Sequence, residues 1–394
     1  MLKAFGNLWL KSARRLAKAQ VGQQKKLQKK LVKSLLPAVK KPRAAPVKKL
    51  KAPHSGSGLA ARPAAVSSRR PMPGATRAAT VAARLDSGGS WSRAYHVSAL
   101  ADSRGRHRRM LYWLYMPQVC DGEAVRRTAP RQLPLVVMLH GCDQSAEEFA
   151  TGTRMNQQAA RHGFAVLYPQ QSASAHAQRC WPWYKRSLQH GGDEVALVAG
   201  LLDKVLAGND FDRRRVYVAG LSAGAALAQA LALHHPDVFA AVGSHSGPVY
   251  GVADSRLSAF AVMQAGSRDA GRIATQLLAA RPDFPVMPVL ILQGEQDPVV
   301  RPVNAGQLAQ QFCILNRLSP AAHEAPVLRK ARGANDAWRR TDYQWQGRVV
   351  VRLCEVAHLA HAWSGGDPSL RYNAAAGPDA SALLWDFFKR QRRR

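Results

Sequence analysis

The chain has 394 residues, enough for one large domain or two ordinary ones, and its hydrophobic fraction of 46% allows a sizeable core. Its net charge of +32 is concentrated near the N-terminus, because residues 1–85 hold 21 of the 57 Lys and Arg residues and no Asp or Glu. This asymmetry argues against a uniformly basic nucleic-acid-binding domain, and the lack of a run of 18 apolar residues argues against a transmembrane helix.

The N-terminal region is predicted to be a basic helical segment, residues 1–36, followed by a linker, residues 37–92. Over residues 2–18, Leu, Phe and Trp fall on one helical face, and five Lys or Arg residues gather on the opposite face. The linker is rich in Pro, Ala, Ser and basic residues, a composition typical of disorder. We expect the helical segment to adhere to an apolar or anionic surface; a solvated tail and non-specific nucleic-acid binding are the alternatives. Lys11 and Arg14 interrupt its apolar stretches, which argues against a secretory signal.

The folded body is predicted to cover residues 93–394 and to alternate between strands and helices. The predicted strands are residues 111–116, 133–139, 164–168, 215–219, 239–244, 286–293 and 349–356. The predicted helices are residues 146–162, 193–207, 223–234, 302–315 and 379–391. This alternation predicts the α/β class, with a mostly parallel sheet that carries helices on both faces.

Residues 220–224 read Gly-Leu-Ser-Ala-Gly and match the G-x-S-x-G pattern of a nucleophile elbow. An apolar strand leads into the motif, and an alanine-rich helix leads out of it. Small residues beside the serine let the backbone turn tightly and expose the hydroxyl, while the helix N-terminus stabilises a developing oxyanion. The pattern predicts Ser222 as a catalytic nucleophile; a structural Gly-rich turn is the alternative.

A serine nucleophile requires a base and an orienting acid, which follow it in the order Ser, Asp, His in sites of this class. Asp297 lies in the loop just past a predicted strand and is the predicted acid, with Glu295 as its nearest rival. His361 lies in a loop of small residues after the last predicted strand and is the predicted base. His358, closer to the end of that strand, is the alternative.

Acyl transfer also requires hydrogen-bond donors for the oxyanion. We expect the backbone N–H groups of Ala223, next to the nucleophile, and of Cys142, after the first core strand, to supply them. The five cysteines are odd in number, widely spaced and never in a C-x-x-C pattern, so they predict neither a zinc site nor a disulfide framework. Trp181, Trp183 and Trp363 are candidate walls of an apolar acyl groove, with core packing as the alternative.

Taken together, these segments resemble the catalytic domain of the type 1 poly(3-hydroxybutyrate) depolymerase esterases, and more loosely the feruloyl and acetylxylan esterases. The resemblance extends over about residues 110–390. It is carried by His140-Gly141-Cys142 with Gln144, Cys180-Trp181 with Trp183, the elbow at 220–224, and residues 236–241 and 361–366. It implies an α/β-hydrolase fold, a triad of Ser222, His361 and Asp297, and hydrolysis of short hydroxyalkanoate esters without a cofactor. It also makes a disulfide between Cys142 and Cys180 plausible, with two free thiols as the alternative.

The sequence also departs from this family. Gln293-Gly294 stands where members often carry His-Gly before the acid, so we expect a differently organised acid loop. The chain reaches Arg394 just past its last predicted helix, without an appended polymer-binding domain, and it carries a basic tail like that of intracellular, granule-acting relatives. We therefore expect a cytoplasmic, granule-associated esterase, with an extracellular enzyme as the alternative. The rival functions are a feruloyl or acetylxylan esterase and a non-catalytic surface-binding protein.

Overall fold

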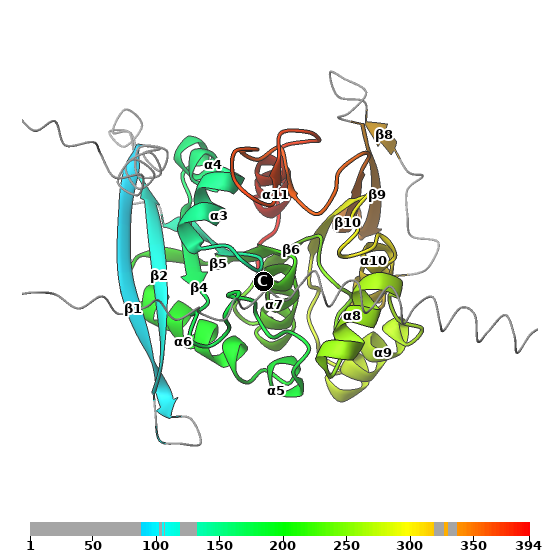
Figure 1. The fold of residues 1–394 in the computed structure, drawn as a ribbon, viewed down its shortest axis with the longest axis horizontal. Coiled ribbons are helices and arrows are strands. Elements are labelled where there is room, and N and C mark those ends of the chain that lie inside the picture. The colour runs from blue at the N-terminus through cyan, green and yellow to red at the C-terminus, as the bar shows by residue number, and fades with distance from the viewer. Residues whose placement is uncertain (1–87, 102–104, 106, 119–131, 319–326, 330–336) are drawn as a thin grey trace, which may run out of the picture. The chain divides into compact units, whose positions relative to one another are not determined.

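The structure is a computed structural model, and it describes residues 88–394 except 102–104, 106, 119–131, 319–326 and 330–336 (Figure 1). The predicted helical segment 1–36 and nearly all of the predicted linker 37–92 lie outside the described residues. The first described strand begins at Gly89, so the last few residues of the predicted linker belong to the folded body.

A ten-stranded sheet forms the centre of the folded body, in the order β1-β2-β4-β3-β5-β6-β7-β10-β9-β8. Its strands are β1 (Gly89–Ala101), β2 (His107–Pro117), β3 (Leu133–Leu139), β4 (Ala165–Gln170), β5 (Phe211–Leu221), β6 (Ala241–His245), β7 (Val289–Gly294), β8 (Val327–Arg329), β9 (Trp338–Trp345) and β10 (Arg348–Val356). The six strands from β4 to β10 in this order pair in parallel, and the strands at both edges pair antiparallel. The predicted α/β class with a mostly parallel sheet is confirmed.

Helices pack on both faces of this sheet. They are α3 (Ala146–Thr153), α4 (Met155–His162), α5 (Arg186–Gln189), α6 (Glu194–Ala207), α7 (Ala223–His234), α8 (Arg256–Ala265), α9 (Ala270–Ala280), α10 (Val303–Leu315) and α11 (Ala380–Phe388). Two short strands, β11 (Trp363–Ser364) and β12 (Asn373–Ala374), pair outside the main sheet. No helix in the described part of the chain is both long enough and apolar enough to span a membrane.

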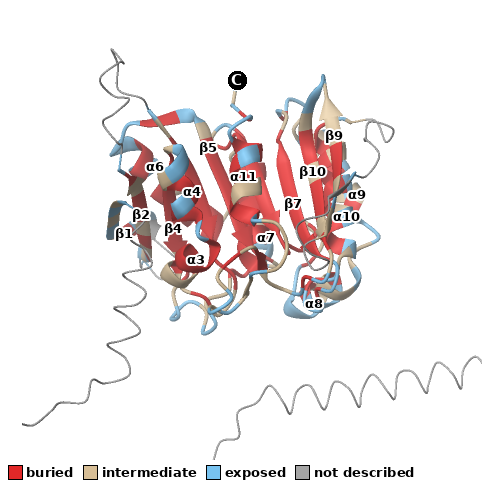
Figure 2. Cartoon of the chain, turned by 90° about the horizontal axis from the view of Figure 1, so that it is seen from above, coloured by how far each residue is buried: buried red, intermediate tan, exposed pale blue. Residues whose placement is uncertain are grey.

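The core strands supply alternate side chains to two hydrophobic clusters, one on each face of the sheet. On β5, Val216 and Val218 join the cluster packed against α6, α7 and α10, whereas Tyr217 and Ala219 join the cluster packed against α3, α4 and α11. Because side chains of a strand alternate between its faces, this double burial explains the nearly continuous apolar runs in the sequence. Figure 2 shows how completely the central strands are buried.

Two expectations about local structure were wrong. Residues 146–162 form two helices, because Arg154 adopts a left-handed conformation with φ of 55° and its N–H closes α3 by donating to the carbonyl of Thr151. The edge strands β1, β8 and β9 were not predicted, because β1 begins within the predicted linker, β8 has only three residues and β9 has a mainly polar sequence. Neither difference alters the parallel strands that carry the candidate site.

Candidate active site

Ser222 lies in a tight turn between the end of β5 and the start of α7. Its φ of 57° and ψ of −120° are an unusual conformation for a residue with a side chain, and its N–H donates to the carbonyl of His245 at 2.9 Å. A Cβ at Gly220 would collide with the backbone of Gly224, and a Cβ at Gly224 would collide with the carbonyl of Leu139. The two glycines therefore permit the close crossing of strand and helix, which places Ser222 at a cavity.

Asp297 follows β7 and is fully buried, with both carboxylate oxygens hydrogen-bonded. Its Oδ1 atom accepts from the N–H groups of Val299 and Val300 at 2.8 and 2.9 Å. Its Oδ2 atom lies 2.7 Å from Nδ1 of His361 and 3.2 Å from Nε2 of Gln293. Burial by itself raises the pKa of Asp297, but the hydrogen bond and charge of His361 and the two backbone N–H groups hold it below its usual value. Asp297 is therefore a buried carboxylate aimed at one histidine.

His361 follows β10 and lies at the wall of the same cavity as Ser222. Since the Asp297 carboxylate can only accept, Nδ1 of His361 carries the hydrogen and Nε2 is left as the basic nitrogen. His358, the alternative base, is exposed and shares a 3.1 Å hydrogen bond with the side chain of Gln296. Glu295, the alternative acid, is 44% exposed and pairs with Arg339. The histidine that contacts a buried carboxylate is therefore His361, and that carboxylate is Asp297. His358 and Glu295 take no part in this contact.

The loop after β3 holds its backbone N–H groups in an ordered arrangement. The N–H of Gly141 donates to the side chain of Gln144 at 2.9 Å, and the N–H of Asp143 donates to the carbonyl of Gln178 at 2.6 Å. Among the described residues, the N–H of Cys142 between them has no hydrogen-bond partner, although Cys142 lines the cavity. Ala223 also lines the cavity and is the first residue of α7, where a backbone N–H has no intrahelical acceptor.

A disulfide joins Cys142 to Cys180, with the two Cα atoms 4.3 Å apart, so the predicted pairing is confirmed. It ties the loop after β3 to the segment that carries Trp181 and Trp183. The indole of Trp181 strengthens this connection, because its Nε1 donates to the carbonyl of His140 at 2.9 Å. The remaining described cysteines, Cys313 and Cys354, are free thiols.

The candidate residues surround a cavity of about 650 Å³ that is open to solvent. Its walls combine aromatic, apolar and a few polar side chains from loops at the carboxyl ends of the strands. Its lining residues include Cys142, Trp181, Trp183, Ser222, Ala223, Ala259, Met263, Val299 and His361. These residues converge at the carboxyl ends of the strands, where α/β folds generally bind ligands.

Trp363 is not a wall of this cavity, contrary to expectation. It is fully buried, stacks on His245 with ring centroids 5.0 Å apart, and donates from Nε1 to the hydroxyl of Ser381 at 3.2 Å. The ring of Trp363 therefore packs in the core, and its N–H has a hydrogen-bond acceptor there. Trp181 and Trp183, by contrast, both line the cavity.

Sequence reasoning missed the residues that support the site from behind. The side chain of Gln293 donates to the Asp297 carboxylate, and to the carbonyl of Val300 at 2.9 Å. The sequence signal for this residue was the Gln293-Gly294 pair, which stands where family members often carry His-Gly. His245 is buried beside Trp363 and its Nε2 accepts from the N–H of Ser364 at 3.2 Å. No local pattern marks His245, because Trp363 and Ser364, which it contacts, lie more than a hundred residues further along the chain.

Comparison with known proteins gives a consistent family and fold. Residues 110–332 match a family model described as Esterase PHB depolymerase. Poly(3-hydroxyalkanoate) depolymerase C of Paucimonas lemoignei is 34% identical over 190 residues, which are 46% of this chain and 45% of that protein. Poly(3-hydroxybutyrate) depolymerase of Ralstonia pickettii is 25% identical over 299 residues, 71% of this chain and 56% of that protein. The chain thus spans about half the length of these curated relatives.

Other similar proteins carry different esterase names. Feruloyl esterase B of Thermothelomyces thermophilus is 33% identical over 150 residues, 37% of this chain and 47% of that protein. Among solved structures, the acetyl xylan esterase from Aspergillus awamori superposes with a TM-score of 0.57 at 16% identity, covering 76% of this chain and 99% of that chain. This structural likeness supports the α/β-hydrolase fold.

Proposed function

Because the chain belongs to the esterase PHB depolymerase family, we propose that it is a serine esterase whose substrates are short-chain poly(3-hydroxyalkanoates) or their oligomers. The observation that carries this proposal is the buried Asp297 carboxylate bonded to His361 at the wall of the cavity that Ser222 also lines. A nucleophile, a base and an orienting acid in this arrangement are what ester hydrolysis through an acyl-enzyme requires.

In the proposed reaction, the Oγ of Ser222 attacks the ester carbonyl carbon while Nε2 of His361 takes the hydroxyl proton. His361 then gives this proton to the departing alcohol as the ester bond breaks, which leaves an acyl group on Ser222. Water attacks the acyl carbon, again losing a proton to His361, and Ser222 is regenerated as the carboxylic acid leaves. Asp297 stays ionised and stabilises the imidazolium that forms in each half of the reaction.

The N–H groups of Cys142 and Ala223 are the proposed oxyanion donors. Support comes from the neighbouring N–H groups of Gly141 and Asp143, which are both engaged elsewhere, whereas the donor of Cys142 has no partner in the described residues. Donors held in place before the reaction cost no reorganisation when charge develops on the carbonyl oxygen. The disulfide to Cys180 supports this role because it anchors the loop that carries the donor.

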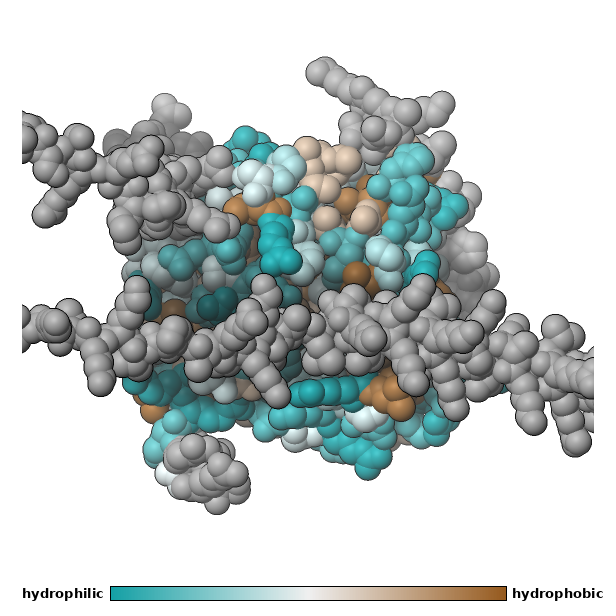
Figure 3. Space-filling model, viewed as in Figure 1, coloured by the Kyte–Doolittle hydropathy of each residue, from teal (hydrophilic) through white to brown (hydrophobic). Residues whose placement is uncertain are grey.

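An apolar surface beside the cavity supports a polyester rather than a polysaccharide substrate. Leu257 and Phe260 of α8 are 75% and 50% exposed, and Val299 and Val303 are each 42% exposed. Ala259 and Met263 on the same helix, with Val299, line the cavity, so this apolar rim adjoins it. On the face seen in Figure 3, the described residues that are visible are mainly hydrophilic, and hydrophobic residues form small separate patches. An exposed cluster of this kind suits contact with an apolar polymer.

The proposal is tested by comparing substrates and one pair of variants. We expect hydrolysis of p-nitrophenyl butyrate and of amorphous polyhydroxybutyrate granules, and slower release of ferulate or acetate from polysaccharide esters. Leu257→Ser with Phe260→Ser should slow granule hydrolysis several-fold and leave p-nitrophenyl butyrate turnover unchanged. Fast polysaccharide-ester hydrolysis without granule turnover would instead establish the feruloyl or acetylxylan alternative.

The proposal also covers the role of the N-terminal tail and the cellular compartment of the protein. We propose that residues 1–36 adhere to an apolar or anionic surface such as a polyester granule, supported by their aromatic and basic composition. The Cys142–Cys180 disulfide favours an oxidising compartment over the cytoplasm, where thiols are kept reduced. We therefore favour the extracellular alternative over the cytoplasmic expectation.

A further inference from the structure

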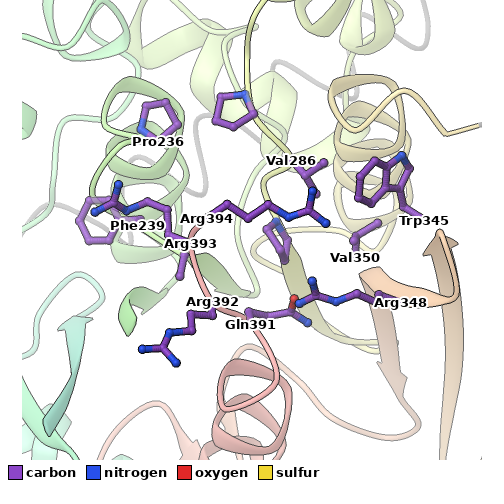
Figure 4. Close-up of a pocket in the computed structure, with 13 residues that line it drawn as sticks. Pro236, Phe239, Val286, Trp345, Arg348, Val350, Gln391, Arg392, Arg393 and Arg394 are labelled. Carbon is purple, nitrogen blue, oxygen red and sulfur yellow. The ribbon is translucent and has the colours of Figure 1, made fainter. Parts of the chain in front are cut away.

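A second cavity, shown in Figure 4, lies at the amino ends of the parallel strands, whereas Ser222 follows the carboxyl end of β5. It has a volume of about 240 Å³ and lies where β6, β7 and β10 begin, whereas Ser222, Asp297 and His361 follow the ends of strands. The residues that line it are Pro236, Phe239, Ala240, Pro285, Val286, Pro288, Trp345, Arg348, Val350, Gln391, Arg392, Arg393 and Arg394. None of these residues has a part in the proposed ester hydrolysis.

Four arginines and no carboxylate side chain line this cavity. Arg392 is 3.3 Å from Asp212, whose Oδ2 already accepts from Arg215 at 2.7 Å. Arg348 and Arg394 are exposed, and neither they nor Arg393 pair with a described carboxylate side chain, although Nη2 of Arg348 donates to the carbonyl of Arg390 at 3.1 Å. Arginines that lack an anion at a concave site favour binding of a carboxylate or phosphate.

The protein holds two of these arginines in place. The Nε of Arg393 is buried and has no hydrogen-bond partner among the described residues, although its Nη2 donates to the carbonyl of Arg213 at 3.3 Å. The guanidinium of Arg394 lies 5.7 Å from the centre of the Trp345 ring, which orients it along the apolar wall. In Figure 4 the side chain of Arg394 extends toward Val286 and Trp345. These contacts leave the guanidinium of Arg394, rather than the buried Nε of Arg393, as the group available to a ligand.

The remaining wall is apolar, which narrows the class of ligand. Phe239, Val286, Trp345 and Val350 present hydrocarbon and aromatic surface beside the guanidinium groups. An inorganic anion would leave this surface without a partner, and an uncharged apolar molecule would leave the arginines without one. We infer that this cavity binds a short-chain aliphatic carboxylate, with its carboxylate at the arginines and its hydrocarbon chain against the apolar wall.

The N-terminal segment of the chain does not have the chemistry to fill the cavity. Residues 1–85 contain 21 Lys and Arg and no Asp or Glu, so their side chains would repel the four arginines. A free carboxylate of four to eight carbons matches both the charge and the small volume. The acids released in the proposed reaction carry a 3-hydroxyl group, so the inference rests on the cavity and not on that reaction.

Isothermal titration calorimetry of the full chain tests this inference with hexanoate, butyrate, methyl hexanoate and inorganic phosphate as probes. Hexanoate should bind more tightly than butyrate by about fourfold for each added methylene, because each is removed from water. Methyl hexanoate, which lacks the charge, and phosphate, which lacks the hydrocarbon chain, should each bind at least tenfold more weakly than hexanoate. Equal binding of phosphate, or no binding of millimolar hexanoate, would overturn the inference.

Variants locate the binding. Arg348→Gln with Arg394→Gln should weaken hexanoate binding about tenfold, the loss expected for charge-assisted hydrogen bonds. Arg161→Gln, an exposed arginine on α4, is the matched control and should leave binding unchanged. Unchanged binding by the double variant would place the carboxylate elsewhere, including at the candidate active site.

A second readout does not depend on those arginine variants folding. Hexanoate should change the fluorescence of the wild type, and this change should be lost in Trp345→Phe because Trp345 is the tryptophan that lines the cavity. The same fluorescence change in Trp345→Phe would contradict the assignment.

Discussion

The Nδ1 atom of His361 lies 2.7 Å from the Oδ2 atom of Asp297. The nearby His358 is hydrogen-bonded to Gln296 instead. Only two residues separate the two histidines, yet His361 is at the cavity wall and His358 is exposed. The left-handed conformation of His358, with φ of 57°, turns the chain between them. This difference gives the first prediction a control within the same loop.

His361→Ala should lower kcat for p-nitrophenyl butyrate by about 10³-fold or more, since loss of the base leaves only binding and oxyanion stabilisation. His358→Ala should lower kcat by less than about threefold, because its hydrogen bond to Gln296 is exposed and does not involve the Asp297 carboxylate. Steady-state kinetics of the two purified variants, with folding checked by circular dichroism, make the comparison. An inactive His358→Ala beside an active His361→Ala would contradict the assignment of the base.

The Cys142–Cys180 bridge is expected to affect both stability and catalysis. Its sequence separation of 38 residues corresponds to about 3–4 kcal/mol of unfolding free energy in the chain-entropy account. Replacing both cysteines by Ala should remove this stabilisation and lower kcat about tenfold, since the loop that carries the oxyanion donor loses its anchor. Urea unfolding and kinetics measure the two effects, with Cys313→Ala as the free-thiol control. A double variant as active and as stable as the wild type would rule out this anchoring role.

Two buried histidines predict how stability depends on pH. Burial lowers the pKa of His245 from the usual 6.5 to about 3, assisted by the nearby charge of His361. Burial likewise lowers the pKa of His140 to about 4, with a smaller contribution from Arg179. The unfolded chain takes up protons on both histidines below pH 6.5, whereas the native protein does not. Stability is therefore fully present above pH 6.5 and is lost as pH falls from there toward 4.

The expected slope is about 1.4 kcal/mol per pH unit for each histidine in this range. Urea unfolding at pH 7 and pH 5 measures it, and His245→Gln should reduce the loss between these two values. His190→Gln, at an exposed position, is the control. A wild type equally stable at both pH values would show that these histidines are not held neutral.

The parts of the fold that were predictable from sequence are those set by local pattern. The strand at 133–139 and the helix at 223–234 have the bounds predicted for them, since each is an apolar run bounded by small or polar residues. β9 was missed because its sequence reads as polar, and its pairing depends on β10. The side chain of Arg352 on β10 contributes to this pairing, because it donates hydrogen bonds of 2.7 and 2.8 Å to the carboxylate of Asp342 on β9.

The residues of the candidate site also divide into those indicated by local sequence pattern and those whose roles depend on contacts with other segments. Ser222, Asp297 and His361 were predictable because each follows a strand in a recognisable order, and the parallel sheet brings strand ends together. Gln293 and His245 were not, since their roles depend on contacts with Asp297 and Ser364. Trp363 was assigned to the cavity from its place beside His361, but its side chain packs into the core instead.

Deleting residues 1–36 tests the proposed adhesion of the tail. The truncated protein should hydrolyse p-nitrophenyl butyrate at nearly the wild-type rate, because none of the residues around the cavity is removed. Its co-sedimentation with polyhydroxybutyrate granules should fall strongly at low salt, where the basic face contributes most. Undiminished granule binding by the truncated protein would assign the tail no adhesive role. Salt-sensitive loss of nucleic-acid binding alone would indicate non-specific charge attraction.

The central claim is that Ser222 carries the acyl group, and mass spectrometry of the protein quenched during turnover tests it most directly. With p-nitrophenyl butyrate, the account predicts one butyryl group per chain on the peptide that contains Ser222, and none on Ser222→Ala, whose kcat should fall about 10³-fold or more. A butyryl group on any other residue, or near wild-type turnover by Ser222→Ala, would contradict it.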